Sequence, residues 1–175
     1  MENNNKQREK TRKESIVDTL SQVASSLTGV VPDYFSGLGT IGIIASRAYG
    51  AAAILPTGAH YGRWRNFLYE KTKTTDKSSR LREFMVEMAA FNTFQVPLYA
   101  TTLTAASFAS HLIKGELIVD FEKVRSGVET LALLSPIAAP GTGIYIDFVR
   151  KLFGLDPAPR EARKMLESEV KEEGE

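Results

Sequence analysis

The chain has no cysteine, one tryptophan and two histidines among its 175 residues. Without cysteine it forms no disulfide and no zinc–thiolate site, and it has no thiolate nucleophile. The two histidines, His60 and His111, are far apart in the sequence and make no metal-ligand pattern. We therefore expect neither a metal nor a cofactor.

Enzyme signatures are also missing. The sequence has no GxSxG, no Walker loop, no GxGxxG after a strand and no HExxH. The 22 basic residues are balanced by 21 acidic ones, so there is no excess of positive charge to favour nucleic acid. These absences predict a protein that is not an enzyme and does not bind nucleic acid.

The most informative feature that is present is an uncharged run. Residues 88–113 contain no Asp, Glu, Lys or Arg. A run of this length can cross a bilayer, which needs about 20 apolar residues. A soluble helix of the same length would normally carry a charged face. The run therefore favours a membrane helix, and the alternative is the buried central helix of a soluble bundle.

The whole chain predicts an all-α, polytopic membrane protein with four transmembrane helices arranged as two hairpins. The predicted spans, which form a transmembrane domain over 15–153, are 15–35, 38–61, 84–113 and 126–149. Only the third has a clear hydropathy signal, because the others contain charged residues. Ser36 and Gly37 make the first turn.

The predicted domain is flanked by two polar segments. Residues 1–14 are a polar N-terminal segment, and 154–175 form a charged tail with a short solvated helix after Pro159. Both segments are expected in the cytoplasm.

The positions of the basic residues support this topology. Five Lys or Arg residues lie in 6–13, seven in 63–82 and five in 150–164, whereas only three lie in 114–125. An even number of spans puts both termini and the middle loop on the same side, which is the basic one. The positive-inside rule then places both termini in the cytoplasm of a multi-pass inner-membrane protein.

The two hairpins also share short patterns. Pro56 precedes Tyr61 by five residues in span two, and Pro140 precedes Tyr145 by five in span four. Spans one and three share Asp18-Thr19 with Gln22 and Asn92-Thr93 with Gln95, although the spacing differs by one. Two hairpins in the same orientation would form a parallel repeat, as in some transporters, and coincidence is the alternative.

Depth arithmetic places several polar residues near the middle of the bilayer. Gln95 lies about 17 Å into span three at 1.5 Å per residue, beside Pro97, and Pro136 reaches a similar depth in span four. Helices interrupted at matching depth are typical of a substrate site. The candidate substrate-binding residues are Asn92, Thr93, Gln95, Pro97 and Pro136.

Charged residues inside the spans form a second group of candidates. Arg47 lies in the outer third of span two, where an unpaired charge is costly, so we expect it to pair with Asp33 or Glu129. At the inner end, the carboxylates are accompanied by Arg65 and Arg150, either as a gating ring or as a marker of the membrane boundary. The candidates for buried charge and coupling are Arg47, Asp18, Glu87, Glu129 and Asp147.

With these residues placed, the chain resembles the L-alanine exporter (AlaE-type) family over about 15–153. The matching residues are Asp18-Thr19, Ser36-Gly37, Ser46-Arg47, Tyr61-Gly62, Arg65, Thr93-Phe94-Gln95, Pro97, Tyr99, Gly143, Tyr145, Asp147 and Arg150-Lys151-Leu152-Phe153. His60 and Asn66 depart from the family pattern, as does the long charged tail, and these departures bear on the substrate more than on the fold.

The resemblance implies an exporter of L-alanine or a similar small neutral amino acid, driven by protons. Asn92 and Gln95 would bind the amino and carboxylate groups, and small neighbours would leave room for a methyl side chain only. One of Asp18, Glu87 and Asp147 would carry the proton.

Two other classes of protein remain open. One is a soluble or membrane-associated helical bundle that acts as an interaction module, and the other is a channel or assembly subunit. Four short spans make a thin bundle, so a homodimer is possible, with small-residue faces such as 48–53 at its interface.

Overall fold

The computed structural model describes residues 2–26, 30–113 and 115–172, and within these ranges it contains helices and no strand. The helices are α1 (Glu2–Ser26), α2 (Val30–Phe35), α3 (Thr40–Lys71), α4 (Arg80–Leu112), α5 (Phe121–Leu152) and α6 (Ala158–Glu172). The predicted all-α class is confirmed.

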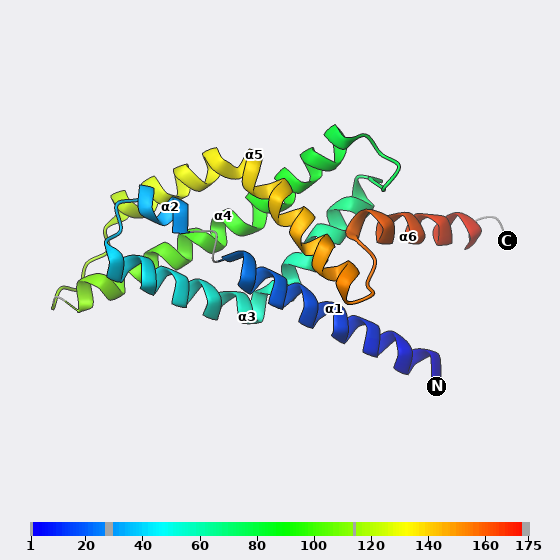
Figure 1. The fold of residues 1–175 in the computed structure, drawn as a ribbon, viewed down its shortest axis with the longest axis horizontal. Helices are drawn as coiled ribbons and strands as arrows, with labels where there is room; N and C mark the ends of the chain where they lie inside the picture. Colours follow the sequence, from blue (N-terminus) through cyan, green and yellow to red (C-terminus); the bar gives the residue numbers. More distant parts are fainter. Residues whose placement is uncertain (1, 27–29, 114, 173–175) are drawn as a thin grey trace.

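Three long helices dominate the arrangement (Figure 1). α3, α4 and α5 have 32, 33 and 32 residues, and α3 packs against both α1 and α4, while α4 also packs against α5. Both termini and the α3–α4 connection lie at one end of the bundle, which we name the terminal end. The opposite end, named the α2 end, holds α2 and the α4–α5 connection (Figure 1).

The helix boundaries have local causes. The predicted turn at Ser36 and Gly37 is confirmed, because the Ser36 N–H donates to the Pro32 carbonyl at 2.9 Å and Gly37 adopts a φ of 73°. α4 begins after Ser79, whose hydroxyl accepts from the Arg82 N–H at 3.3 Å. α5 begins after Asp120, which caps the Lys123 N–H at 3.1 Å.

The predicted span 15–35 is wrong as a single helix. The structure divides it between the last part of α1 and the short α2, with residues 27–29 outside the described part of the chain. The bundle therefore has three long helices and one that is divided. Hydrogen-bonding side chains are concentrated near this break, where Ser25 and Ser26 bond the backbone carbonyls of Gln22 and Val23.

The hydropathy signal also falls on a different helix. Among the described residues, α5 alone combines the length and mean hydropathy of a membrane span, whereas the sequence analysis assigned that signal to 84–113. The run in α4 is uncharged, but Asn92, Gln95 and several threonines lower its hydropathy. The uncharged run therefore lies in α4, whereas the helix with the mean hydropathy of a membrane span is α5.

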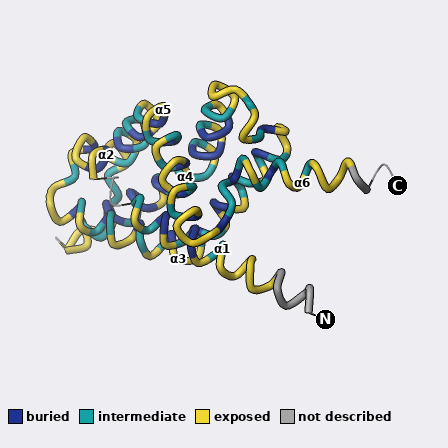
Figure 2. Tube along the Cα trace, turned by 45° about the vertical axis from the view of Figure 1, so that its right-hand side comes forward, coloured by how far each residue is buried: buried dark blue, intermediate teal, exposed yellow. Residues whose placement is uncertain are grey.

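The tail helix is not simply solvated. α6 begins at Ala158, and both Ala158 and Ala162 are buried in a cluster with Tyr69 and Val86. The second half of α6 is exposed, as the tube in Figure 2 shows. The expectation of a solvated tail is therefore correct only for the part of α6 that follows its first turns.

Several large apolar side chains are exposed and two arginines are buried, which is the opposite of what soluble proteins usually show. On α5, Leu133, Ile137 and Ile144 are 81%, 77% and 72% exposed, while Arg65 and Arg150 are among the largest fully buried side chains. Soluble proteins almost never bury arginine fully unless it is paired, and they rarely expose large contiguous apolar faces.

We expect Gly62→Ala to destabilise the bundle. A Cβ at this position would lie 1.9 Å from Oδ2 of the buried Asp18, and overpacking of this kind costs about 1–3 kcal/mol. Gly141→Ala is the matched control, because a Cβ there has no atom within 4 Å. The thermal midpoint in detergent should fall for Gly62→Ala alone, and equal midpoints would contradict the packing.

Candidate functional site

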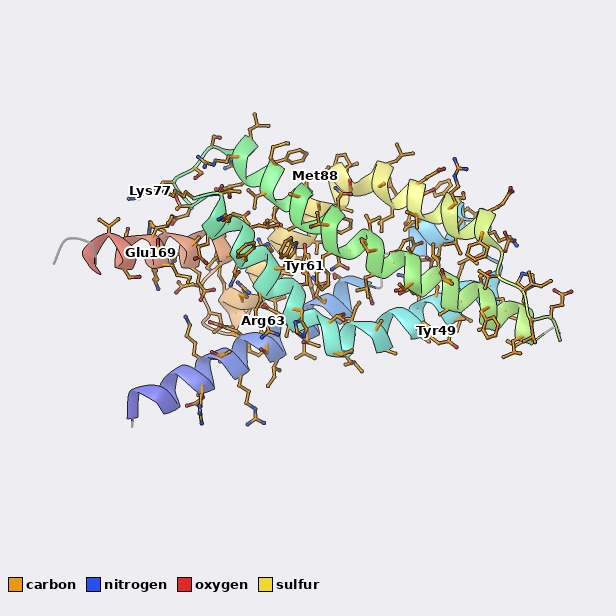
Figure 3. All side chains as sticks on the ribbon, turned by 180° about the vertical axis from the view of Figure 1, so that it is seen from behind. Tyr49, Tyr61, Arg63, Lys77, Met88 and Glu169 are labelled. Atoms are coloured by element: carbon orange, nitrogen blue, oxygen red, sulfur yellow. The ribbon has the colours of Figure 1, made fainter. Side chains whose placement is uncertain are left out.

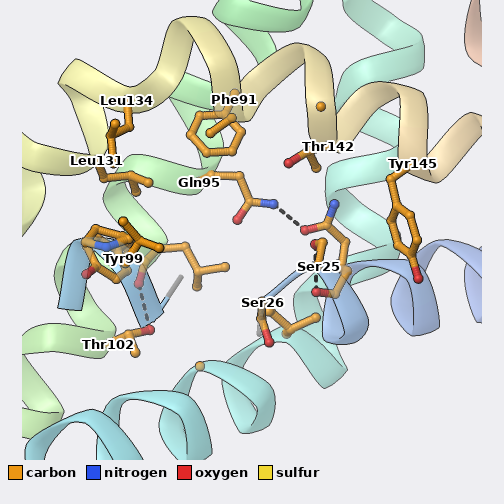
Figure 4. Close-up of a pocket in the computed structure, with 18 of the residues that line it drawn as sticks. Ser25, Ser26, Phe91, Gln95, Tyr99, Thr102, Leu131, Leu134, Thr142 and Tyr145 are labelled. Atoms are coloured by element: carbon orange, nitrogen blue, oxygen red, sulfur yellow. Dashed lines mark hydrogen bonds between the residues drawn. The ribbon is translucent and has the colours of Figure 1, made fainter. Parts of the chain in front are cut away.

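A cavity of about 640 Å³ lies in the middle of the bundle, with walls from α1, α2, α3, α4 and α5 (Figure 4). Its lining combines large apolar residues, including Phe91, Leu98, Leu131 and Leu134, with small and polar ones. The cavity is within the usual range for ligand sites, about 300–1,000 Å³. Small residues also line the cavity, among them Ala24, Gly50, Ala138 and Gly141.

Two glutamines form the polar wall of the cavity at its middle. The Gln95 Nε2 donates to Oε1 of Gln22, and the oxygen of Gln95 points away from this bond (Figure 4). Gln22 is only 2% exposed, and its Nε2 is buried without a partner among the described residues. These are the two glutamines that the predicted repeat pairs with each other, and the repeat itself stays a prediction.

An ion pair borders the cavity toward the α2 end. Nε and Nη2 of Arg47 donate to the two carboxylate oxygens of Asp33, each at 2.8 Å. Asp33 is fully buried and also accepts from the Tyr99 hydroxyl at 2.5 Å. The Arg47 guanidinium lies 5.9 Å from the centre of the Tyr99 ring, which is within the range of a cation–π contact.

The predicted pairing of Arg47 is thus confirmed with Asp33 and not with Glu129. Glu129 instead accepts from Nε of Arg125 at 2.7 Å on the surface, where both side chains are more than half exposed. Glu129 is therefore not a buried charge.

A second set of ion pairs lies between the cavity and the terminal end. Arg65 on α3 donates from Nε to Glu87 at 2.8 Å and from Nη1 and Nη2 to Asp147, each also at 2.8 Å. Glu87 accepts a further bond from the Tyr69 hydroxyl at 2.7 Å. These contacts fasten α3 to α4 and to α5 through one guanidinium.

Arg150 forms the other half of this set. Its Nε and Nη2 donate to the two oxygens of Asp18 at 2.7 Å, and its Nη1 donates to the Asn66 amide oxygen at 3.1 Å. Two glycines leave room for the carboxylates: a Cβ on Gly62 would overlap Asp18, and a Cβ on Gly143 would overlap Glu87. We name Arg65, Arg150, Asp18, Glu87 and Asp147 the terminal ion network.

The terminal ion network contains three carboxylates and two guanidinium groups. When all five are ionised, it carries one excess negative charge, and the binding of one proton removes that excess. The charges also lie where water is scarce, since four of the five residues are 5% exposed or less. The expected ion pairs are therefore present, while a gating ring and a marker of the membrane boundary both stay predictions.

Only one of the five predicted substrate-binding residues lines the cavity, and it is Gln95. Asn92 donates to the Met88 carbonyl and to the Ser135 hydroxyl, at 2.9 and 3.2 Å, between α4 and α5. Thr93 accepts from the Trp64 indole at 2.9 Å. Pro97 on α4 and Pro136 on α5 are exposed and face away from the interior of the bundle.

Two tyrosines were not predicted as site residues. Tyr99 holds Asp33 from 66 positions away, and Tyr69 holds Glu87 from the far end of α3. Figure 3 shows Tyr61 in the interior between the long helices, and its hydroxyl is buried without a partner among the described residues. No spacing rule connects Tyr99 and Tyr69 to their carboxylate partners, because the contacts depend on which helix faces which.

A helical bundle with a central cavity and buried ion pairs at both ends of it has room for a small solute. Residues 6–156 match the family described as L-alanine exporter, so the chain belongs to the L-alanine exporter family, which consists of membrane transport proteins rather than enzymes.

Two curated relatives carry the same name. The L-alanine exporter AlaE of Pantoea sp. (strain At-9b) is 27% identical over 156 residues, which cover 87% of this chain and 84% of the relative. The L-alanine exporter AlaE of Cereibacter sphaeroides is 25% identical over 143 residues, covering 81% and 96%. No solved structure matches this chain.

We expect Arg47 and Asp33 to behave as one unit. Removing one partner of a buried ion pair leaves a charge without compensation, which costs about 3–5 kcal/mol. Arg47→Asp and Asp33→Arg should therefore each lower the thermal midpoint and the yield of folded protein in detergent. The combined swap should recover part of the loss, and a swap no better than either single variant would contradict the pairing.

Proposed function

We propose that the chain exports L-alanine and similar neutral amino acids across the cell inner membrane, which it crosses four times with both termini in the cytoplasm. The observation that carries the proposal is the central cavity, which the amides of the buried Gln22 and the half-buried Gln95 line inside a chain of the L-alanine exporter family. The spans are α1 together with α2, then α3, α4 and α5.

The surface of the long helices supports insertion in a bilayer. Leu133, Ile137, Ile144 and Phe148 lie on α5 at spacings of four, seven and four residues, and all are more than half exposed. This spacing places them on one face, which would be covered by lipid chains. The basic residues near the termini and the α3–α4 connection favour the cytoplasmic side for the terminal end.

The glutamine pair suits the two charged groups of an amino acid. The unpartnered Nε2 of Gln22 is a donor for a carboxylate, and the oxygen of Gln95 is an acceptor for an ammonium group. Tyr99, next to the Arg47–Asp33 pair, is one helical turn from Gln95, about 6 Å along α4. A compact zwitterion therefore spans the distance between the amides and this ion pair.

The apolar wall suits a side chain larger than a methyl group. Phe91, Leu98 and Leu131 offer contact surface, and none of them carries a group that would need a polar partner. Selectivity for a neutral side chain follows, because a charged one would be desolvated there without compensation. Alanine is accepted on this basis, and valine or leucine should compete with it.

The terminal ion network supports proton coupling. Its one excess carboxylate gives the site a place for a proton, and Asp147 is the most accessible of the three at 18% side-chain exposure. Binding a proton would weaken the hold of Arg65 on α5, which connects the proton to a change in helix packing.

A homodimer is consistent with the surface of α3. Ala48 and Ala52 are exposed one turn apart beside Tyr49, which is 44% exposed. Small residues on an outer face let membrane helices approach closely.

The first experimental prediction of this proposal concerns transport. A strain that lacks alanine export and degradation is loaded with an alanyl dipeptide, and intracellular alanine is followed with and without the protein. The protein should lower intracellular alanine, an uncoupler should abolish the drop, and Gln95→Ala or Gln22→Ala should remove it because the zwitterion loses its polar contacts.

Thr101→Ala is the matched control for that assay. Thr101 lies on α4, is exposed and bonds only the Leu98 carbonyl of its own helix, so its loss should leave export unchanged. Alanine that stays high in cells whose membranes contain the wild-type protein would refute the substrate, and a drop that persists with the uncoupler would refute proton coupling.

The second prediction concerns topology and uses the absence of native cysteine. Lys77→Cys lies in the α3–α4 connection, which Figure 3 places at the same end as Glu169 of α6. Leu117, the second position to be replaced by cysteine, lies in the α4–α5 connection at the α2 end. An impermeant maleimide added to intact cells should label Cys at 117 and not at 77. Labelling of both or of neither would contradict the four-span arrangement.

A further inference from the structure

α6 extends beyond the part of the chain that matches the exporter family. The match ends at residue 156, and α6 begins at Ala158. The helix is nevertheless docked, because Ala158 is 0% exposed and Ala162 is 2% exposed against Tyr69 and Val86. The family fold and this additional helix therefore share a packed interface at the terminal end.

The docked part of α6 brings a carboxylate to Arg150. Glu161 accepts from the Asn66 amide nitrogen at 2.9 Å, and its carboxylate lies 3.8 Å from Nη1 of Arg150. The same side chain accepts from Lys10 of α1 at 3.1 Å. Although burial alone lowers the pKa of Lys10, the hydrogen bond and charge of Glu161 raise it, so this lysine stays charged.

The first turn of α6 also reaches Asp147. The Ala158 N–H donates to Oδ1 of Asp147 at 3.2 Å. The free N–H groups at a helix start attract a negative charge, so the start of α6 stabilises ionised Asp147 in its contact with Arg65. α6 thus holds one residue from each half of the terminal ion network.

The terminal ion network stands between the cavity and the end where α6 docks. On α1, Asp18 lies one turn beyond Gln22, and on α5, Arg150 lies between one and two turns beyond Tyr145, which lines the cavity. A solute that leaves or enters the cavity through the terminal end must pass these residues. Their pairing closes that route, and α6 adds contacts to both halves of the closure.

The rest of α6 is suited to release. Beyond Ala162 the helix is held mainly by Arg163, which lies 3.1 Å from Asp76 on a partly exposed surface. Val170 is 71% exposed. The part of α6 beyond Ala162 therefore adds little to the docking, and undocking depends on the contacts of Ala158, Glu161 and Ala162.

We propose that α6 is a latch for the terminal end of the cavity, with Glu161 as the positioning residue that holds Arg150 and Asn66 in the closed arrangement. The proposal rests on the proposed export function, since it assigns α6 the regulation of access to the same cavity. When α6 undocks, the closed arrangement of the terminal ion network becomes less stable and the cavity opens toward the terminal end.

The test uses a single reporter cysteine at Thr142, which lines the cavity. In vesicles, an impermeant maleimide is added on the side that holds the termini, and the initial labelling rate is measured. Glu161→Ala should raise this rate about tenfold, as expected for loss of a charged hydrogen bond. Glu161→Gln keeps an acceptor for Asn66 and should give a smaller increase, and Glu169→Ala on the exposed part of α6 should give none.

A second reporter separates opening from general unfolding. Ala106→Cys is buried in the outer half of α4 at 0% exposure, so its labelling should not change with Glu161→Ala. Equal acceleration at both reporters, or an unchanged rate at position 142, would overturn the latch. These labelling rates do not depend on alanine transport, so a failed export assay with faster labelling at position 142 would refute the proposed function alone.

Discussion

The burial of Arg65 and Arg150 is the constraint on which the rest of the structure depends. Both guanidinium groups are almost fully removed from solvent, and their partners come from α1, α4 and α5. A buried charge without a partner is expensive, so the helices that supply the carboxylates have to meet at this level. Gly62 and Gly143 let Asp18 and Glu87 approach α3 and α5 closely. The cavity lies next to these contacts, on the side of the α2 end.

The distribution of polar groups in the cavity depends on the same helices that meet at Arg65 and Arg150. The bond between Gln22 and Gln95 lies where the two hairpins meet, and the other polar residues of the lining include Ser25, Ser26, Arg47, Thr102 and Thr142. An ion pair bounds each end of this region, Arg47–Asp33 on one side and the terminal ion network on the other. A solute in the middle is thus separated from both ends by ion pairs between helices, and in the proposed exporter alternating access would require these pairs to break and form in turn.

Much of the fold followed from the sequence, whereas little of the site geometry did. The turn at Ser36 and Gly37, the three long helices and the pairing of Arg47 with either Asp33 or Glu129 were predictable, because they depend on local residues and on the cost of an unpaired charge. Depth alone placed Pro97 and Pro136 beside Gln95, yet both prolines face outward. Depth fixes how far along a helix a residue lies and not which side faces the bundle. The contact of Glu161 with Asn66 spans 95 residues, so no local pattern records it.

The ion pairs that join the two hairpins also bear on the order in which the protein folds during synthesis. Asp18 is synthesised 132 residues before Arg150, and Arg65 is synthesised 82 residues before Asp147. The first hairpin contains both members of the Arg47–Asp33 pair, but it leaves the ribosome without the partners of Asp18 and Arg65, which only the second hairpin supplies. Neither half is a complete unit of assembly, so commitment to the folded bundle comes at the end of translation rather than hairpin by hairpin.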